Sequence, residues 1–207
     1  MAHALMMPLV LAATAHASPT LWYVTRATAV ASYVALSVAV MLGILRSLAR
    51  RTNERLSWIV DETHQFLSTL AVVLVAGHMV TLVLDPFLPF SVKNLVLPVN
   101  EPYRQTAVNF GVFAFYTLVV LWLSSWNKNR LPYTFWRNVH YLSFVAFVLV
   151  TLHGWQAGSD TNEPFMRGIY IGSTVAIAFL TAMRLFASPR KVAATILQSA
   201  NARQPMR

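Results

Sequence analysis

The chain has 207 residues, of which 57% are hydrophobic and only 11% are charged, and it contains no cysteine. Soluble domains carry about a quarter charged residues, so this composition excludes an ordinary soluble protein and predicts an integral membrane domain surrounded by a lipid bilayer. The lack of cysteine excludes disulfides, thiolate metal sites and Cys-ligated iron–sulfur clusters. The net charge of +9 is concentrated in short segments beside the apolar stretches, which indicates membrane topology, and we expect no nucleic-acid partner.

Residues 1–19 form a short apolar segment that contains Pro8 and is too short to span a membrane comfortably. Its Ala15-His16-Ala17 sequence resembles a signal-peptidase site, although no Lys or Arg precedes it. Two interpretations stay open, an N-terminal apolar tail and a cleaved signal segment.

Five apolar stretches that are long enough to cross a bilayer as helices follow this segment. We expect these spans at about 21–45, 56–84, 106–126, 133–155 and 166–186. A proline-rich connection joins the second and third spans, and a basic tail over 188–207 follows the fifth. The predicted fold class is therefore all-α, an integral membrane helical bundle of about five transmembrane helices over residues 20–187.

Lys and Arg residues are unevenly divided between the two sides of these spans. The connections after the first, third and fifth spans hold twelve of the sixteen, namely Arg46, Arg50, Arg51, Arg55, Lys128, Arg130, Arg137, Arg184, Arg190, Lys191, Arg203 and Arg207. The other side holds Arg26, Lys93, Arg104 and Arg167. Because cytoplasmic connections are enriched in Lys and Arg, we expect the N-terminus outside and the C-terminus with its basic tail in the cytoplasm.

Two of the spans carry two histidines each. His64 and His78 lie 14 residues apart in the second span, and His140 and His153 lie 13 apart in the fourth. Fourteen residues correspond to about 21 Å along a helix and leave the two rings within about 40° of each other around its axis. Because both spans run in the same direction, His64 is expected to pair with His140 near the cytoplasmic face, and His78 with His153 near the outer face.

Ionisable side chains inside a membrane are costly, face the protein interior and usually mark function. An interhelical hydrogen bond would explain one histidine, but four in two pairs matched by depth are hard to explain by packing. Structural zinc needs four close ligands, whereas each level offers two. Two axial imidazoles suit a haem iron, whose other four ligands come from its own porphyrin, so the histidines predict two haem centres stacked across the membrane.

The 13-residue spacing raises a geometric question, because it leaves His140 and His153 about 140° apart around an ideal helix. One alternative is a locally tightened helix, such as a 3₁₀ stretch. The other is that the two haems approach the helix from different sides. The sequence does not choose between them.

Four arginines near the ends of the spans are candidates to bind haem propionates, which are carboxylates that pair well with guanidinium groups. Arg26 and Arg104 are expected at the outer end, and Arg55 and Arg137 at the inner end. Interfacial anchoring explains the last three equally well. Arg26 is the best candidate, because it lies inside its span, one turn past an aromatic pair.

Several segments resemble the ferric-reductase-like transmembrane domain that NADPH oxidases share with ferric reductases. The most specific segment is the fourth span and its following loop, LPYTFWRNVHYLSFVAFVLVTLHGWQAGSD. The second span contributes HQFLSTL and GHMVTLVLDPFLPFS, and the first contributes WYVTRATAVASYVALSVAVMLG. The resemblance covers about residues 20–187, and the histidine spacings of 14 and 13 match those of the oxidases as well.

The resemblance implies two b-type haems that pass electrons outward from the cytoplasmic face. His64 and His140 would be the axial ligands of the inner haem iron, and His78 and His153 those of the outer one. Arg26 is similar to the first-span arginine that faces the outer haem in the oxidases. Complete relatives also carry a cytoplasmic domain that binds flavin and NADPH.

No glycine-rich dinucleotide fingerprint occurs in the 207 residues, so we expect no flavin or NADPH site in this chain. The expected donor is a separate flavoprotein reductase or quinol, and the expected acceptor is ferric iron or dioxygen. Whether the chain alone is an enzyme stays open.

Two alternative functions remain. The first is a haem-binding membrane subunit that feeds an extracytoplasmic reductase, as in the methionine sulfoxide reductase system. The second belongs to another class, a haem-free transporter or scaffold whose histidines bind protons or metal ions. All of these place the chain as a multi-pass protein in a plasma membrane, which we expect to be bacterial.

Overall fold

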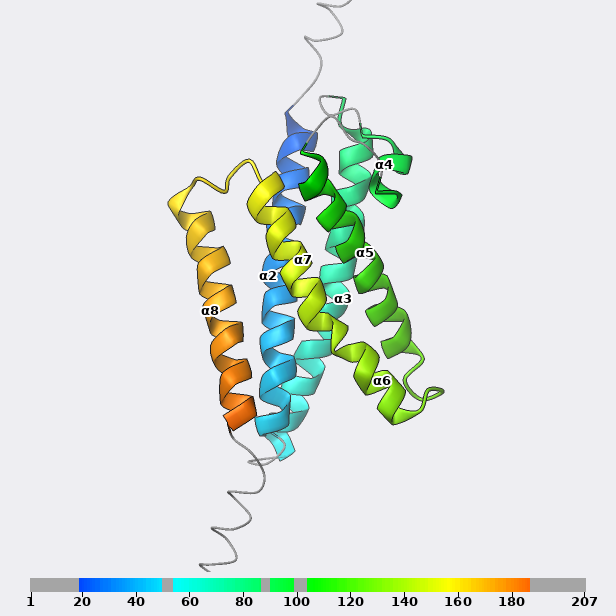
Figure 1. Cartoon of the computed structure of the whole chain (residues 1–207), viewed down its shortest axis with the longest axis vertical. Coiled ribbons are helices and arrows are strands. Elements are labelled where there is room, and N and C mark those ends of the chain that lie inside the picture. The colour runs from blue at the N-terminus through cyan, green and yellow to red at the C-terminus, as the bar shows by residue number, and fades with distance from the viewer. Residues whose placement is uncertain (1–18, 50–53, 87–89, 99–103, 187–207) are drawn as a thin grey trace, which may run out of the picture.

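The computed structural model describes residues 19–49, 54–86, 90–98 and 104–186 (Figure 1). The N-terminal segment expected over 1–19, apart from its last residue, and the basic tail expected over 188–207 lie outside these described residues.

All five expected spans are helical, and the part of the chain that the structure describes contains no strand. The helices that form the spans are α2 (Thr20–Ala49), α3 (Glu54–Leu84), α5 (Gln105–Trp126), α6 with α7 (Tyr133–His140 and Leu142–Ala157) and α8 (Pro164–Phe186). Each of the five is long and apolar enough to cross a membrane. The predicted all-α membrane bundle is therefore confirmed. Which face each terminus occupies stays a prediction.

The fourth span consists of two helices that meet at Tyr141, and α6 turns away from the axis of α7 there (Figure 1). The Tyr141 N–H is shared between the Arg137 and Asn138 carbonyls, each at 3.3 Å, and the Phe144 N–H donates to the Tyr141 carbonyl at 3.1 Å. Hydrogen bonds between residues three apart are those of a tightened 3₁₀ turn. The helix between His140 and His153 is therefore interrupted at Tyr141, which is the kind of local change that the first alternative for the 13-residue spacing describes. The side from which each haem would approach the span stays a prediction.

The proline-rich connection contains a short helix, α4 (Val92–Val96), that the hydrophobic pattern does not predict. The Ser91 N–H donates to the side-chain oxygen of Asn94 at 2.9 Å at its start, and the Tyr116 hydroxyl of α5 donates to the Val96 carbonyl at 2.5 Å at its end. Five residues make less than two turns, which is too few for a periodic pattern to reveal a helix.

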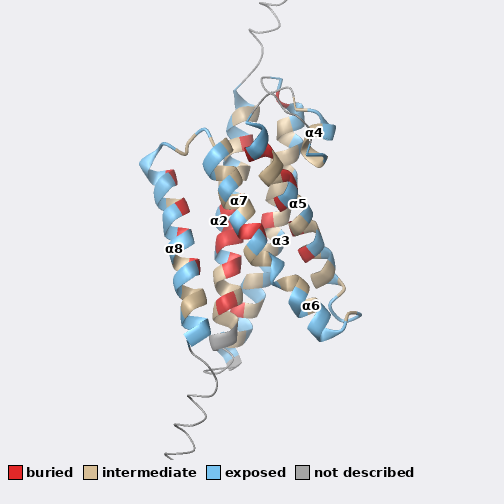
Figure 2. Cartoon of the chain, viewed as in Figure 1, coloured by how far each residue is buried: buried red, intermediate tan, exposed pale blue. Residues whose placement is uncertain are grey.

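The core lies around α2, which contacts α3, α7 and α8 (Figure 2). Its central buried side chains include Tyr33, Leu36, Val40 and Ile44. Large apolar side chains also cover the outside of the bundle; Phe179 of α8, for example, is 62% exposed. Such a surface is expected where lipid, rather than water, surrounds a protein.

A buried group of hydroxyls fastens α8 to α2 and α7. The Tyr33 hydroxyl lies 2.6 Å from Oγ of Ser173 and 3.3 Å from Oγ1 of Thr151.

We expect Tyr33→Phe to lower the free energy of unfolding by about 0.5–1.5 kcal/mol, because it removes these hydrogen bonds without changing the ring. Thermal unfolding in detergent measures this loss. Tyr23→Phe is the control, since Tyr23 is 57% exposed, and equal unfolding midpoints for the two variants would contradict the prediction.

Candidate metal centres

The structure brings the four span histidines together in two pairs, one towards each end of the bundle. His64 of α3 and His140 of α6 have ring centroids 6.0 Å apart, with 68° between the ring planes. They line a cavity of about 1040 Å³, which we call the His64 cavity. His78 of α3 and His153 of α7 line a second cavity of about 250 Å³, the His78 cavity. The structure therefore brings together the same pairs that the sequence matches by depth.

Three of the four rings are held by a backbone carbonyl of a neighbouring helix. Nδ1 of His64 lies 2.7 Å from the carbonyl oxygen of Ala39, and Nδ1 of His78 lies 3.1 Å from that of Thr25. Nδ1 of His153 lies 2.8 Å from the carbonyl oxygen of Ala107. A carbonyl oxygen only accepts, so each Nδ1 carries the proton and donates it, which leaves Nε2 unprotonated. This is the second contact that metal-binding histidines usually make, and it prepares Nε2 to bind a metal.

The fourth ring, His140, is held differently. Its Nδ1 is buried and has no hydrogen-bond partner among the described residues. The ring stacks on Trp136, one turn earlier in α6, with centroids 5.0 Å apart and 26° between the planes. The indole nitrogen of Trp136 is also buried without a partner in the described part of the chain. Two such polar atoms in the wall of one cavity suggest that a further polar group belongs there.

The spacing of His64 and His140 fits one iron atom held between them. Metal–imidazole bonds of about 2 Å on each side would place the two ring centroids roughly 6 Å apart, which agrees with the distance observed. The described ranges contain no group of three or more His, Asp or Glu side chains that could hold a metal ion, whereas structural zinc needs four ligands. The residues present therefore fit a haem iron, which takes two axial ligands from the protein.

Two glycines make room for the rings, and sequence reasoning missed both. A Cβ atom added to Gly111 of α5 would lie 2.8 Å from Nδ1 and Cε1 of His153. A Cβ atom added to Gly43 of α2 would lie 3.2 Å from Cε1 of His64. A glycine in an apolar span signals a close approach only once the neighbour that it faces is known, so the sequence carried no usable signal.

Arg26, the best of the four propionate candidates in the sequence, lies in the lining of the His78 cavity. Its guanidinium group forms an ion pair with Asp160 and lies 4.1 Å from the centroid of the Trp22 ring. Sequence reasoning did not single out Asp160, because a lone carboxylate in a polar loop has no pattern that marks it.

The other three candidate arginines lie in different surroundings. Arg137 lines the His64 cavity, with its guanidinium carbon 5.7 Å from the Tyr133 ring centroid. Among the described residues, Arg55 and Arg104 belong to the lining of neither cavity. Arg104 donates a hydrogen bond to the carbonyl of Gln156 at the end of α7.

Further cations line the His64 cavity, although sequence reasoning used them for topology alone. Arg46 of α2 forms an ion pair with Asp61 of α3, with one hydrogen bond of 2.8 Å. Lys128 and Arg184 also contribute to the lining. Together with Arg137 they make this end of the bundle basic, which suits carboxylates such as haem propionates.

The family described as ferric reductase like transmembrane component matches residues 28–151, a segment that contains His64, His78 and His140 and ends two residues before His153. No curated protein and no solved structure matches the chain. Transmembrane domains of this family generally bind haem. The match covers more than half of the 207 residues and agrees with the five apolar helices. The chain therefore belongs to the ferric reductase like transmembrane component family and is a multi-pass membrane protein of the electron-transfer kind.

Proposed function

We propose that this protein is a b-type cytochrome with two haems that carries single electrons across a bacterial plasma membrane. One observation carries the proposal: two histidine pairs lie towards opposite ends of one bundle, and each lines its own cavity. His64 and His140 would be the axial ligands of the inner haem, and His78 and His153 those of the outer haem.

Each haem would supply a one-electron iron couple, and the residues of this chain would place and tune it. The carbonyls of Ala39, Thr25 and Ala107 fix the tautomer of three rings and make Nε2 a better ligand. Buried apolar side chains in the core, among them Ala146 and Phe147 of α7, exclude water from the interior. A dry interior is one of the properties by which a protein sets the reduction potential of a metal centre.

The distribution of basic residues supports electron entry at the His64 cavity. Arg46, Lys128, Arg137 and Arg184 line it, and basic residues favour the cytoplasmic side of a membrane. The donor would be a separate flavoprotein reductase or quinol. Electrons would leave from the His78 cavity to ferric iron, dioxygen or an extracytoplasmic protein.

Propionate binding is proposed for the arginines that line the cavities. Arg137 at the His64 cavity and Arg26 at the His78 cavity are the best placed of the four that the sequence suggested. Arg46 and Arg184 join them as candidates at the His64 cavity.

An absorption spectrum of the purified protein tests the proposed function. After dithionite reduction, we expect the reduced-minus-oxidised spectrum of a b-type cytochrome, with two haems per chain. Adding ferric chelate, dioxygen or a candidate extracytoplasmic protein to the reduced form then identifies the acceptor by its reoxidation. A colourless protein from cells with ample haem would contradict the cytochrome and favour a haem-free transporter or scaffold.

A further inference from the structure

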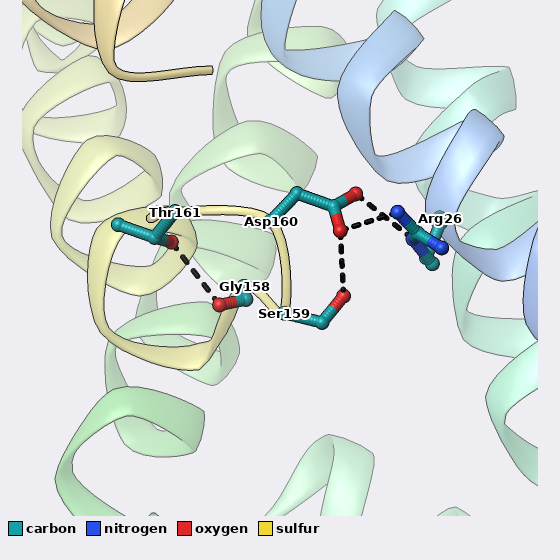
Figure 3. Close-up of polar contacts among 5 residues, drawn as sticks. All are labelled: Arg26, Gly158, Ser159, Asp160 and Thr161. Atoms are coloured by element: carbon teal, nitrogen blue, oxygen red, sulfur yellow. Dashed lines mark hydrogen bonds and ion pairs between the residues drawn. The ribbon is translucent and has the colours of Figure 1, made fainter. Parts of the chain in front are cut away.

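The ion pair between Arg26 and Asp160 joins two segments 134 residues apart at the His78 cavity (Figure 3). Nε of Arg26 donates to Oδ2 of Asp160 at 2.8 Å, and a second guanidinium nitrogen contacts Oδ1. Both side chains belong to the lining of the cavity, and they are only 33% and 25% exposed. Two parallel contacts fix the guanidinium group in direction as well as in position.

The loop between α7 and α8 is held in shape by its own hydrogen bonds, which present Asp160 to α2. Oγ1 of Thr161 donates to the carbonyls of Gly158 and Gly154 at 3.1 and 3.2 Å (Figure 3 draws the first). The Glu163 N–H donates to the Asp160 carbonyl at 2.9 Å. The carboxylate is therefore held by an ordered turn instead of reaching Arg26 from a free chain end.

Both ends of the ion pair are close in sequence to groups that hold the histidines. Thr25, which directly precedes Arg26, supplies the carbonyl bound by Nδ1 of His78. Gly154, whose carbonyl anchors the loop, directly follows His153. The pair therefore ties the part of α2 that holds one ring to the end of the helix that carries the other.

The main effect of the pair is on charge. Partly exposed ion pairs add little to stability, so stability alone does not explain this geometry. Without Asp160, Arg26 would present a full positive charge to the His78 cavity. A positive charge favours the reduced state of a nearby iron, because reduction adds an electron, and it also attracts anionic acceptors.

We propose that Asp160 is a positioning residue that fixes Arg26 and cancels its charge at the outer haem. Asp160 thereby lowers the reduction potential of the outer haem and limits its preference for anionic acceptors. The inference rests on the proposed function, since it requires a haem in the His78 cavity.

Redox titration of the purified holoprotein, followed by haem absorbance, tests the inference. Asp160→Asn keeps the shape of the side chain and removes its charge. We expect the reduction equilibrium of the outer haem to shift about tenfold towards the reduced form, or about 59 mV for one electron, with the inner haem unchanged. Asp160→Glu keeps the negative charge, so this variant should keep the wild-type reduction potential of the outer haem. Glu163→Gln is the matched control, because it removes a negative charge from the same loop outside the cavity lining.

Acceptor charge gives a second measurement on the same variant. Holoprotein that has been reduced with dithionite and then freed of the excess is mixed with the anion hexacyanoferrate(III) or with the cation hexaammineruthenium(III), each of which takes one electron from the iron. Asp160→Asn should raise the second-order rate constant of reoxidation by the anion several-fold and lower that of reoxidation by the cation. A merely structural role of Asp160 would change both in the same direction.

An unchanged potential of the outer haem in Asp160→Asn would overturn the inference, as would an equal shift in Glu163→Gln. If Asp160→Asn does not accumulate, Arg26→Gln leaves Asp160 uncompensated and should shift the potential by a similar amount in the opposite direction. No shift in that variant would overturn the inference as well. A wild-type protein without haem would refute the proposed function itself, so the two failures are distinguishable.

Discussion

The His78→Ala variant is expected to bind about one haem per chain instead of two and to stop electron transfer to the outer face. His78 is one of two histidines lining its cavity, so its loss would leave the proposed outer haem iron with His153 alone. The His64 pair lies about 21 Å away along α3 and should keep its haem. Residues that only hydrogen-bond to a metal ligand already change metal affinity about 10–100-fold when they are mutated. The loss of a ligand itself should therefore lower the affinity for the outer haem at least about 100-fold.

Haem content per chain measures the first effect, and reduction of an enclosed or external acceptor in proteoliposomes measures the second. His64→Ala should give the converse result, with the outer haem retained. Thr63→Ala is the control on the same helix, because its exposed hydroxyl only donates to the Ile59 carbonyl. Loss of both haems in His78→Ala, or of neither, would show that the histidines do not pair by depth.

The Gly111→Ala variant is expected to lose the outer haem although it changes no ligand. The new Cβ would lie 2.8 Å from Nδ1 and Cε1 of His153, closer than side chains approach one another in folded proteins. The ring cannot retreat freely, because its Nδ1 is bonded to the Ala107 carbonyl at 2.8 Å. Moving the ring breaks that hydrogen bond and misplaces Nε2, while leaving it in place strains α5 by about 1–3 kcal/mol.

The haem content of Gly111→Ala should therefore fall to about one per chain, with the spectrum of the inner haem preserved. Gly168→Ala is the matched control in α8, because a Cβ there meets no atom within 4 Å. It should keep both haems, and alanine should favour the helix slightly. Gly43→Ala should have a weaker effect on the inner haem, since its Cβ lies 3.2 Å from Cε1 of His64. Two haems with unchanged spectra in Gly111→Ala would contradict the close packing of the ring.

Some features of the site could be predicted from the local sequence pattern, and others could not. The pairing of His64 with His140 and of His78 with His153 follows from helix rise and direction, which depend only on sequence separation. The turn at Tyr141 could be stated only as one of two alternatives, because the hydrophobic pattern of an apolar span is the same for a regular helix and for an interrupted one. The short helix α4 has too few residues to produce a periodic signal.

The amino-acid sequence by itself determined the five apolar spans, the all-α membrane fold and the depth of each histidine. These are properties of one segment at a time: apolar length, rise per residue and the position of a side chain along it. Only the tertiary structure decided that Gly111 faces His153, that the Ala39, Thr25 and Ala107 carbonyls hold three rings, and that Asp160 meets Arg26. Such contacts depend on how each helix is rotated and tilted against its neighbours, which packing between distant segments sets and no local pattern records.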